Sequence, residues 1–93
     1  MTPILGNSEA DPDQFRRLLD EEHEWPSPYT FKFIVPLVRL DNLLLLLDGF
    51  ELETRTSRNG NYVSLTLSPL MDSSEAVIQF YTSVSVIEGL VAL

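Results

Sequence analysis

The apolar positions of this chain change their spacing several times, and each change marks a new element. Phe31, Phe33 and Val35 lie at every second position, which is typical of a strand with one strongly apolar face. In the next stretch, leucines recur at spacings of three and four residues, as on one face of a helix. We therefore predict a strand over 29–35 and a helix over 37–47.

The middle of the chain predicts a β-hairpin. Apolar and polar side chains alternate over 50–56 and again over 62–67. Between these segments stand Asn59 and Gly60, a pair that supplies the positive φ values of tight hairpin turns. We expect two antiparallel strands joined at this turn.

One more helix and one more strand are predicted in the last third of the chain. Asp72 followed by Glu75 resembles a capping box with Asp72 as the N-cap residue. Apolar residues then recur at helical spacing, so a helix is predicted over 72–84. Residues 87–93 are mostly aliphatic and predict a closing strand.

Two further segments precede this pattern. The first ten residues lack apolar periodicity, and we expect 1–10 to form a flexible tail. Asp11 followed by Pro12 is typical of a helix start, whereas the two prolines after Trp25 prevent a helix from continuing. A helix over 11–24 is therefore predicted as an appendage of the main domain.

The order of the elements predicts the fold class. The order β-α-β-β-α-β is that of an α+β, ferredoxin-like two-layer sandwich, in which two helices cover one face of a four-stranded antiparallel sheet. Right-handed crossovers favour the strand order 4-1-3-2, with 29–35 as a central strand. We expect one ferredoxin-like domain over 25–93, with 11–24 as an extra N-terminal helix.

Composition and charge narrow the classes of function. Ninety-three residues are the size of one domain, and fourteen acidic against six basic residues give a net charge of −8. This charge disfavours binding to nucleic-acid phosphates, and a chain without cysteine has no disulfide, thiolate nucleophile or cysteine zinc site. No apolar run approaches the roughly 20 residues of a membrane span, and no secretory signal pattern is present. We expect a cytoplasmic protein that binds neither membrane nor nucleic acid.

Groups that could carry out catalysis are scarce. His23 is the single histidine, and its neighbours Glu22 and Glu24 diverge from it on a helix. Because a metal site or a proton-transfer pair needs convergent side chains, we predict no catalytic residue, no metal and no other cofactor. The alternatives are a small enzyme on a ferredoxin-like fold and RNA binding through the open sheet face, where Tyr62 is the predicted aromatic residue.

The leucine run over 43–47 supports two interpretations. A helix in a two-layer fold buries one stripe, so Leu45 and Leu46 cannot face the sheet together with Leu44 and Leu47. In the first interpretation, the extra leucines pack against the N-terminal helix as additional core. In the second, they form a surface for a partner, because exposed apolar patches mark contacts.

The closing strand is the second candidate for a contact. Residues 87–93 are predicted to form one edge of the sheet and contain Glu88 as their only charge, so their backbone groups are open to another strand. In the predicted arrangement Leu90 and Ala92 lie beside Ile34 as an apolar strip. The predicted surface for a homodimer or a partner protein therefore comprises Ile34, Leu45, Leu46, Leu90 and Ala92.

Three segments resemble the YbeD-like family of small bacterial proteins, a domain of unknown function. They are Pro-Tyr-Thr-Phe-Lys-Phe-Ile-Val-Pro over 28–36, Ser-Arg-Asn-Gly-Asn-Tyr over 57–62, and the closing sequence over 84–93. Together with the N-terminal helix, the resemblance covers about residues 12–93. It implies an ACT-like version of the ferredoxin-like fold and a regulatory role.

The first turn departs from the pattern of ACT-type effector sites. Those sites use a glycine after the first strand, which lets the backbone approach a small molecule. This chain has Val35, Pro36 and Leu37 at that junction, with no glycine and no amide hydrogen on Pro36. We therefore expect no small-molecule effector at this turn, and a regulatory or protein-interaction module is the predicted function.

Overall fold

The computed structural model describes residues 12–93 and has a mixed α+β architecture. The predicted tail over 1–10 and the first residue of the predicted N-terminal helix lie outside the described residues. Three α-helices, one short 3-10 helix and two antiparallel sheets make up the described part. The elements, in chain order, are α1 (Pro12–Glu22), β1 (Ser27–Pro28), β2 (Phe31–Pro36), η2 (Leu37–Arg39), α2 (Leu40–Leu46), β3 (Glu53–Thr56), β4 (Tyr62–Leu67), β5 (Leu70–Met71), α3 (Ser74–Val84) and β6 (Val91–Ala92).

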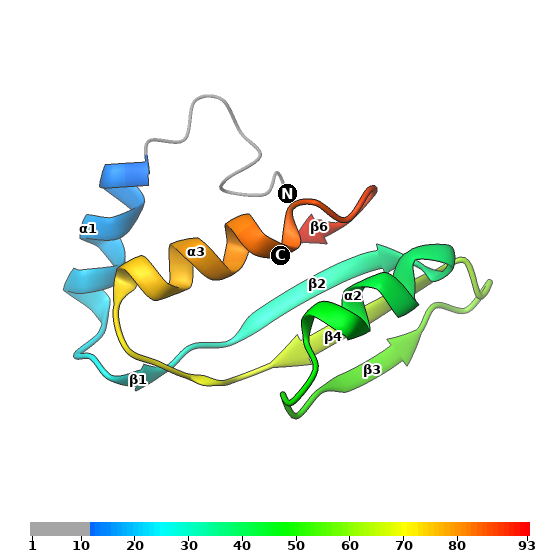
Figure 1. The fold of residues 1–93 in the computed structure, drawn as a ribbon, viewed down its shortest axis with the longest axis horizontal. Helices are drawn as coiled ribbons and strands as arrows, with labels where there is room; N and C mark the ends of the chain where they lie inside the picture. Colours follow the sequence, from blue (N-terminus) through cyan, green and yellow to red (C-terminus); the bar gives the residue numbers. More distant parts are fainter. Residues whose placement is uncertain (1–11) are drawn as a thin grey trace.

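Four strands form the main sheet, in the order β3-β4-β2-β6 (Figure 1). Each neighbouring pair is antiparallel, and β2 pairs with β4 on one side and with β6 on the other. The aromatic strand therefore lies in the interior of the sheet, as predicted. β1 and β5 form a separate two-stranded sheet, which the apolar pattern did not predict because each strand has only two residues.

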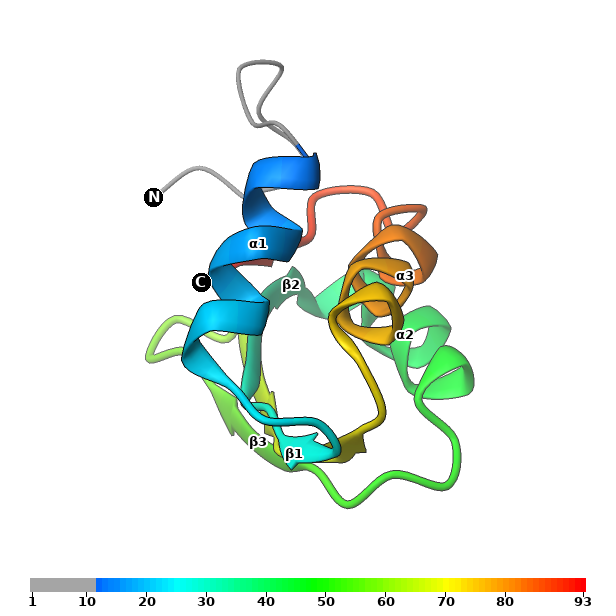
Figure 2. The same cartoon turned by 90° about the vertical axis from the view of Figure 1, so that its left-hand side faces the viewer.

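One face of the main sheet forms the core together with the helices. Phe31, Phe33 and Val35 of β2 are fully buried, and the alternate residues of β4 are buried with them. α2 and α3 lie next to each other on the same side of the sheet (Figure 2). The strict alternation of apolar residues in the sequence thus corresponds to the buried face of the sheet.

The predicted hairpin turn joins β3 to β4. Gly60 has a φ of 78°, in the left-handed region that favours glycine. The side chain of Asn59 accepts a hydrogen bond from the backbone N–H of Asn61, and the hydroxyl of Ser57 accepts one from the backbone N–H of Tyr62. These bonds satisfy backbone donors in the turn, so the register of the hairpin is determined locally.

α3 begins one residue later than the capping prediction. Its N-cap is Ser73, whose hydroxyl accepts a hydrogen bond from the backbone N–H of Ala76 at 3.1 Å. The prediction of Asp72 as the N-cap is therefore wrong, because Ser73 has the extended backbone conformation that an N-cap needs. α3 buries five residues: Ser74, Val77, Ile78, Tyr81 and Val84.

α1 packs against α3 rather than against α2. Arg16 forms ion pairs with Asp13 and with Glu75 of α3, and the ring of Phe15 lies 6.0 Å from that of Tyr81. Leu19 is buried in the core. The interpretation in which the leucine run covers the N-terminal helix is therefore wrong.

An aromatic cluster fills the space between β2 and α3. The ring of Phe31 stacks on Phe80 with centroids 4.2 Å apart and meets Tyr81 edge-on at 5.1 Å. The hydroxyls of Tyr29 and Tyr81 lie 3.1 Å apart in a hydrogen bond. Desolvation by burial raises the pKa of Tyr81, and this hydrogen bond raises that pKa further.

The closing segment is mostly a turn. Residues 87–89 leave α3 in a turn and only Val91–Ala92 form β6, so the predicted strand over 87–93 is wrong over most of its length. Gly89 has a φ of 79°, and a Cβ at this position would lie 2.8 Å from Cγ of Pro36. The close approach of these two segments brings Glu88 to 3.6 Å from Arg39 in an ion pair.

Candidate functional site

The single histidine belongs to a packed corner of the molecule. His23 stacks on Trp25 with ring centroids 5.1 Å apart, and its Nδ1 lies 3.1 Å from the backbone oxygen of Leu19. Trp25 in turn donates a hydrogen bond from Nε1 to Asp20 at 2.8 Å. His23 is half-buried rather than solvated, and its contacts position the end of α1. Within residues 12–93 no group of three or more metal-ligating side chains comes together.

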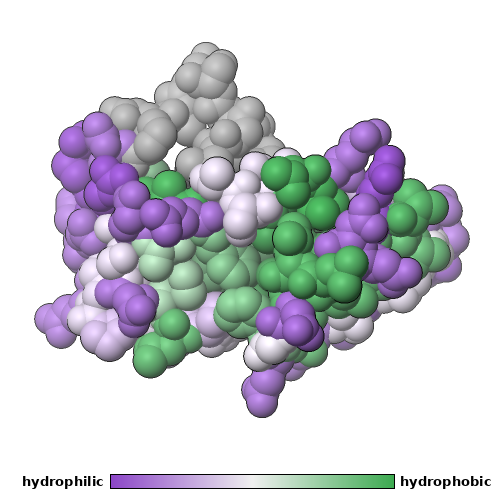
Figure 3. Space-filling model, in the orientation of Figure 1, coloured by the Kyte–Doolittle hydropathy of each residue, from purple (hydrophilic) through white to green (hydrophobic). Residues whose placement is uncertain are grey.

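The strongest surface feature is an apolar face formed by η2 and α2, here called the α2 face. It consists of Leu37, Val38, Leu45 and Leu46, with Asp41 and Asn42 exposed between them. Val38 is 85% exposed and Leu45 is 79% exposed, values that a core position never has. Figure 3 shows apolar surface over α2 and towards the C-terminal end of α3, where Val86 is also exposed.

The helical arrangement explains why these leucines are exposed. Leu43 and Leu47 are buried against the sheet, with Leu40 and Leu44 half-buried beside them. Successive residues of a helix are about 100° apart around its axis. Leu45, two positions after Leu43, therefore lies on nearly the opposite side of the helix, and Leu46 lies next to Leu45. Leu45 and Leu46 therefore point away from the sheet, and the structure places them on the surface.

The predicted apolar strip at the edge of the sheet does not form. Val91 pairs with Ile34, whereas Ala92 pairs with Phe33 and is buried on the core face. Leu90 is half-buried and packs against the core. The prediction that Leu90 and Ala92 lie beside Ile34 is wrong, because the register differs by one residue and side chains on a strand alternate between faces.

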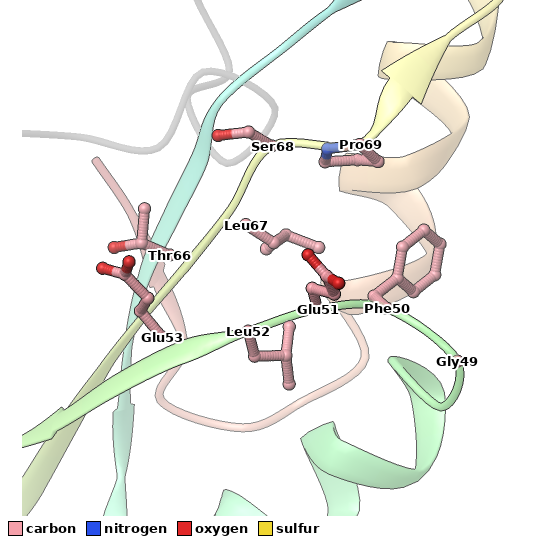
Figure 4. Close-up of a pocket in the computed structure, with 9 residues that line it drawn as sticks. All are labelled: Gly49, Phe50, Glu51, Leu52, Glu53, Thr66, Leu67, Ser68 and Pro69. Atoms are coloured by element: carbon pink, nitrogen blue, oxygen red, sulfur yellow. The ribbon is translucent and has the colours of Figure 1, made fainter.

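A hollow of about 720 Å³ lies where β3 and β4 part (Figure 4). The last paired residues are Glu53 and Thr66, beyond which the two chain segments diverge. In the view of Figure 4 the side chain of Glu51 points towards Leu67, and Glu53 and Thr66 lie at the end away from Phe50. It is lined by Gly49, Phe50, Glu51, Leu52, Glu53, Thr66, Leu67, Ser68 and Pro69.

The chemistry of this hollow is limited to weak acids and hydroxyls. Glu51 and Glu53 supply carboxylates, and Ser68 supplies a hydroxyl that lies 2.9 Å from that of Thr30. The lining contains no lysine, arginine or histidine, so it offers no positively charged side chain to hold an anionic substrate. The ring of Phe50 lies 5.7 Å from that of Phe80 and closes one end of the hollow.

Charge is distributed unevenly over the molecule. The segment from Asp13 to Glu24 contains five acidic residues and two basic ones. α1 lies at one end of the long axis, and η2 lies towards the opposite end (Figure 1). On the α2 face the charged groups are few, and Arg39 is paired with Glu88. The most apolar surface is thus separated from the most acidic one.

Comparisons with known proteins give no match: no family model, no curated protein and no solved structure matches this chain. No helix within residues 12–93 has the length and apolar character needed to cross a membrane.

Sequence reasoning identified part of the α2 face and missed the rest. Leu45 and Leu46 were predicted as a surface for a partner, and both are exposed. Leu37 and Val38 of this face were missed, and so was the exposed Val86 outside it. Val38 had a signal in the sequence, because it precedes Leu45 by seven residues, or about two helical turns. Val86 had none, because it lies in a turn outside any apolar period.

Proposed function

We propose that this protein is a non-enzymatic protein-interaction module that binds its partner through the α2 face. The observation that supports the proposal is the exposure of Val38 of η2 and Leu45 of α2, at 85% and 79%. Exposed apolar side chains that lie near one another on a small domain are costly in water and are characteristic of contact sites. A regulatory role of the module fits the same surface, because a regulatory domain acts by binding another chain.

We further propose that the domain is ferredoxin-like in topology, with strand order 4-1-3-2, and that it is YbeD-like and ACT-like. The antiparallel pairings of β2 with β4 and β6, and of β3 with β4, support this topology. So does the chain order, in which α2 connects β2 to β3 and α3 follows β4. The family and its regulatory role rest on the sequence resemblance.

The proposal is tested by capture from the native cell with matched variants. Leu45→Glu places a charge in the α2 face, whereas Leu70→Glu places the same charge on β5, where Leu70 is 64% exposed. We expect the wild type and Leu70→Glu to retain the same partner and Leu45→Glu to lose it. Circular dichroism of each variant controls for folding. Equal capture by wild type and Leu45→Glu would contradict the proposal.

The hollow between β3 and β4 favours a second candidate, the binding of a small effector. Its carboxylates and the exposed ring of Phe50 suit a molecule with a protonated amine, because such a cation pairs with carboxylates and with aromatic faces. A thermal-shift screen with amino acids and amines tests this candidate. A ligand at 100 times its dissociation constant adds about 2.7 kcal/mol of stability. Glu51→Gln is the matched variant. If the ligand raises the unfolding temperature of this variant as much as that of the wild type, the hollow is not its binding site.

A further inference from the structure

We propose that the occupant of the α2 face is a second copy of this chain, which packs α2 against α2 around a two-fold axis. This inference rests on the proposed function and names its partner. The stripe at the centre of the face is Val38, Asp41, Asn42 and Leu45. This stripe is complementary to the same stripe of a second copy when the two run antiparallel. Such self-complementarity is the condition for a closed two-fold dimer.

The complementarity follows from one register. When Val38 of one copy faces Leu45 of the other, the two-fold axis falls between Asp41 and Asn42. Asp41 of each copy then faces Asn42 of the other, so a carboxylate accepts a hydrogen bond from a side-chain amide twice in the interface. Within the stripe, the two polar residues therefore meet each other, and Val38 meets Leu45.

The most acidic segment of the molecule lies away from this face. Two chains of charge −8 repel each other, and the repulsion is strongest where the acidic residues of α1 would meet. α1 is at the opposite end of the long axis from η2 (Figure 1), so a contact centred on α2 keeps the two acidic segments apart. Exposed charges farther apart than about 10 Å are screened at physiological salt.

The α2 face lies on the broadest side of the molecule. Figure 1 looks down the shortest axis of the molecule, so the side that carries α2 and α3 is the broadest, 39 × 29 Å. A standard interface buries about 800 Å² per partner, a small part of the 6220 Å² of accessible surface of this molecule. Leu37 and Leu46, which are also exposed, lie on the same two helices as the central stripe. The edge strand β6 has only two residues and therefore offers a much shorter edge for a contact.

The first experiment measures the molar mass of the purified full chain by light scattering and sedimentation across a range of concentrations. The chain has a mass of 10.5 kDa, and we expect the wild type and Leu70→Glu to reach twice that value. Leu45→Glu is expected to raise the dissociation constant by about tenfold or more, because it places a carboxylate without a partner against Val38 of the other copy. A wild type that is monomeric at every concentration, or a Leu45→Glu variant that dimerises like the wild type, overturns the proposal.

The second experiment tests the register and uses the absence of cysteine from this chain. Val38→Cys and Leu45→Cys are prepared separately and then mixed under mild oxidation. Helices packed with axes about 8–10 Å apart bring facing positions within the roughly 4.4–6.8 Å between Cα atoms that a disulfide spans. We expect a cross-linked dimer in the mixture and little in either variant alone. Cross-linking of Leu45→Cys to itself at the level of the mixture overturns the antiparallel register.

The two proposals fail in different ways. A monomeric pure chain whose capture of a cellular partner still depends on Leu45 would overturn the dimer and leave the interaction module in place. A monomeric chain whose capture does not depend on Leu45 would overturn both.

Discussion

The two helices that cover the sheet differ in how they use their apolar residues. α3 has 11 residues, a side-chain N-cap and five buried positions. α2 has seven residues and no side-chain cap, and within its span only Leu43 is buried, although five of the seven are leucine. A high content of leucine therefore does not make a helix more buried, because a helix on a sheet can bury only one side.

The difference between the helices follows from what lies beside each of them. α3 is covered by the sheet on one side and by α1 on another, so Tyr81 contacts both Phe33 of β2 and Phe15 of α1. α2 has the sheet and α3 as neighbours, and its outer side has no covering element among residues 12–93. Helix stability in proteins comes mainly from such packing. α3 is thus part of the core, whereas α2 has an exposed apolar side.

The largest effect is expected in the sheet beneath α3. Phe33 is 0% exposed and lies within ring-contact distance of Phe80 and Tyr81, so Phe33→Ala should destabilise the fold by about 3–5 kcal/mol. Since domains have a total stability of about 5–15 kcal/mol, the variant should be close to unfolding. Urea unfolding followed by circular dichroism measures the change. A variant as stable as the wild type would contradict the core assignment.

A pair of substitutions within α2 tests the division between its two sides. Leu43 is 0% exposed, so Leu43→Ala should cost about 2–5 kcal/mol, whereas Leu45→Ala should lie within about 0.5 kcal/mol of the wild type. Both are measured by urea unfolding at low protein concentration. Equal losses in the two variants would show that Leu45 is part of the core after all.

The cap of α3 provides a smaller test of the same comparison. Ser73→Ala removes the hydrogen bond to the N–H of Ala76 and should cost about 1 kcal/mol. At the N-cap of α2, Arg39 makes no such bond, so Arg39→Ala should show no cap loss. Thermal unfolding of the two variants measures the loss of stability at each helix start. A larger loss in Arg39→Ala would reverse the comparison.

The smallest effect concerns pH and the hydroxyl of Tyr81. Its pKa is raised in the folded state by burial and by the hydrogen bond with Tyr29, whereas an unfolded tyrosine ionises near pH 10. The favourable contribution is therefore complete below about pH 10 and is lost as the pH rises above it, because the unfolded state then releases a proton that the folded state retains. Tyr81→Phe should show a shallower decline of stability above pH 10 than the wild type, with the exposed Tyr62→Phe as control. A decline as steep as that of the wild type would contradict this role for the phenol.

Different parts of the structure were predictable to different degrees. The alternation over β2 and β4 and the Asn59-Gly60 turn are local signals, and the structure has strands and a turn there. The ends of the elements were less accurate: β3 begins at Glu53 rather than at residue 50, and β6 is confined to two residues. At the candidate site, Leu45 and Leu46 were identifiable because they exceed what one stripe of a helix can bury. Val86 was not, because it stands in a turn beyond the end of α3, where helical spacing no longer separates buried from exposed residues.

The sequence by itself determined the three helices, the strands β2 and β4 with their apolar faces, and the turn before β4, because spacing and turn chemistry act over a few residues. The tertiary structure decided which leucines lie outside, that α1 covers α3, and that Val91 rather than Ala92 meets Ile34. These outcomes depend on contacts between residues far apart in the chain, and a shift of one residue in strand register exchanges the two faces. The same long-range packing left the α2 face exposed.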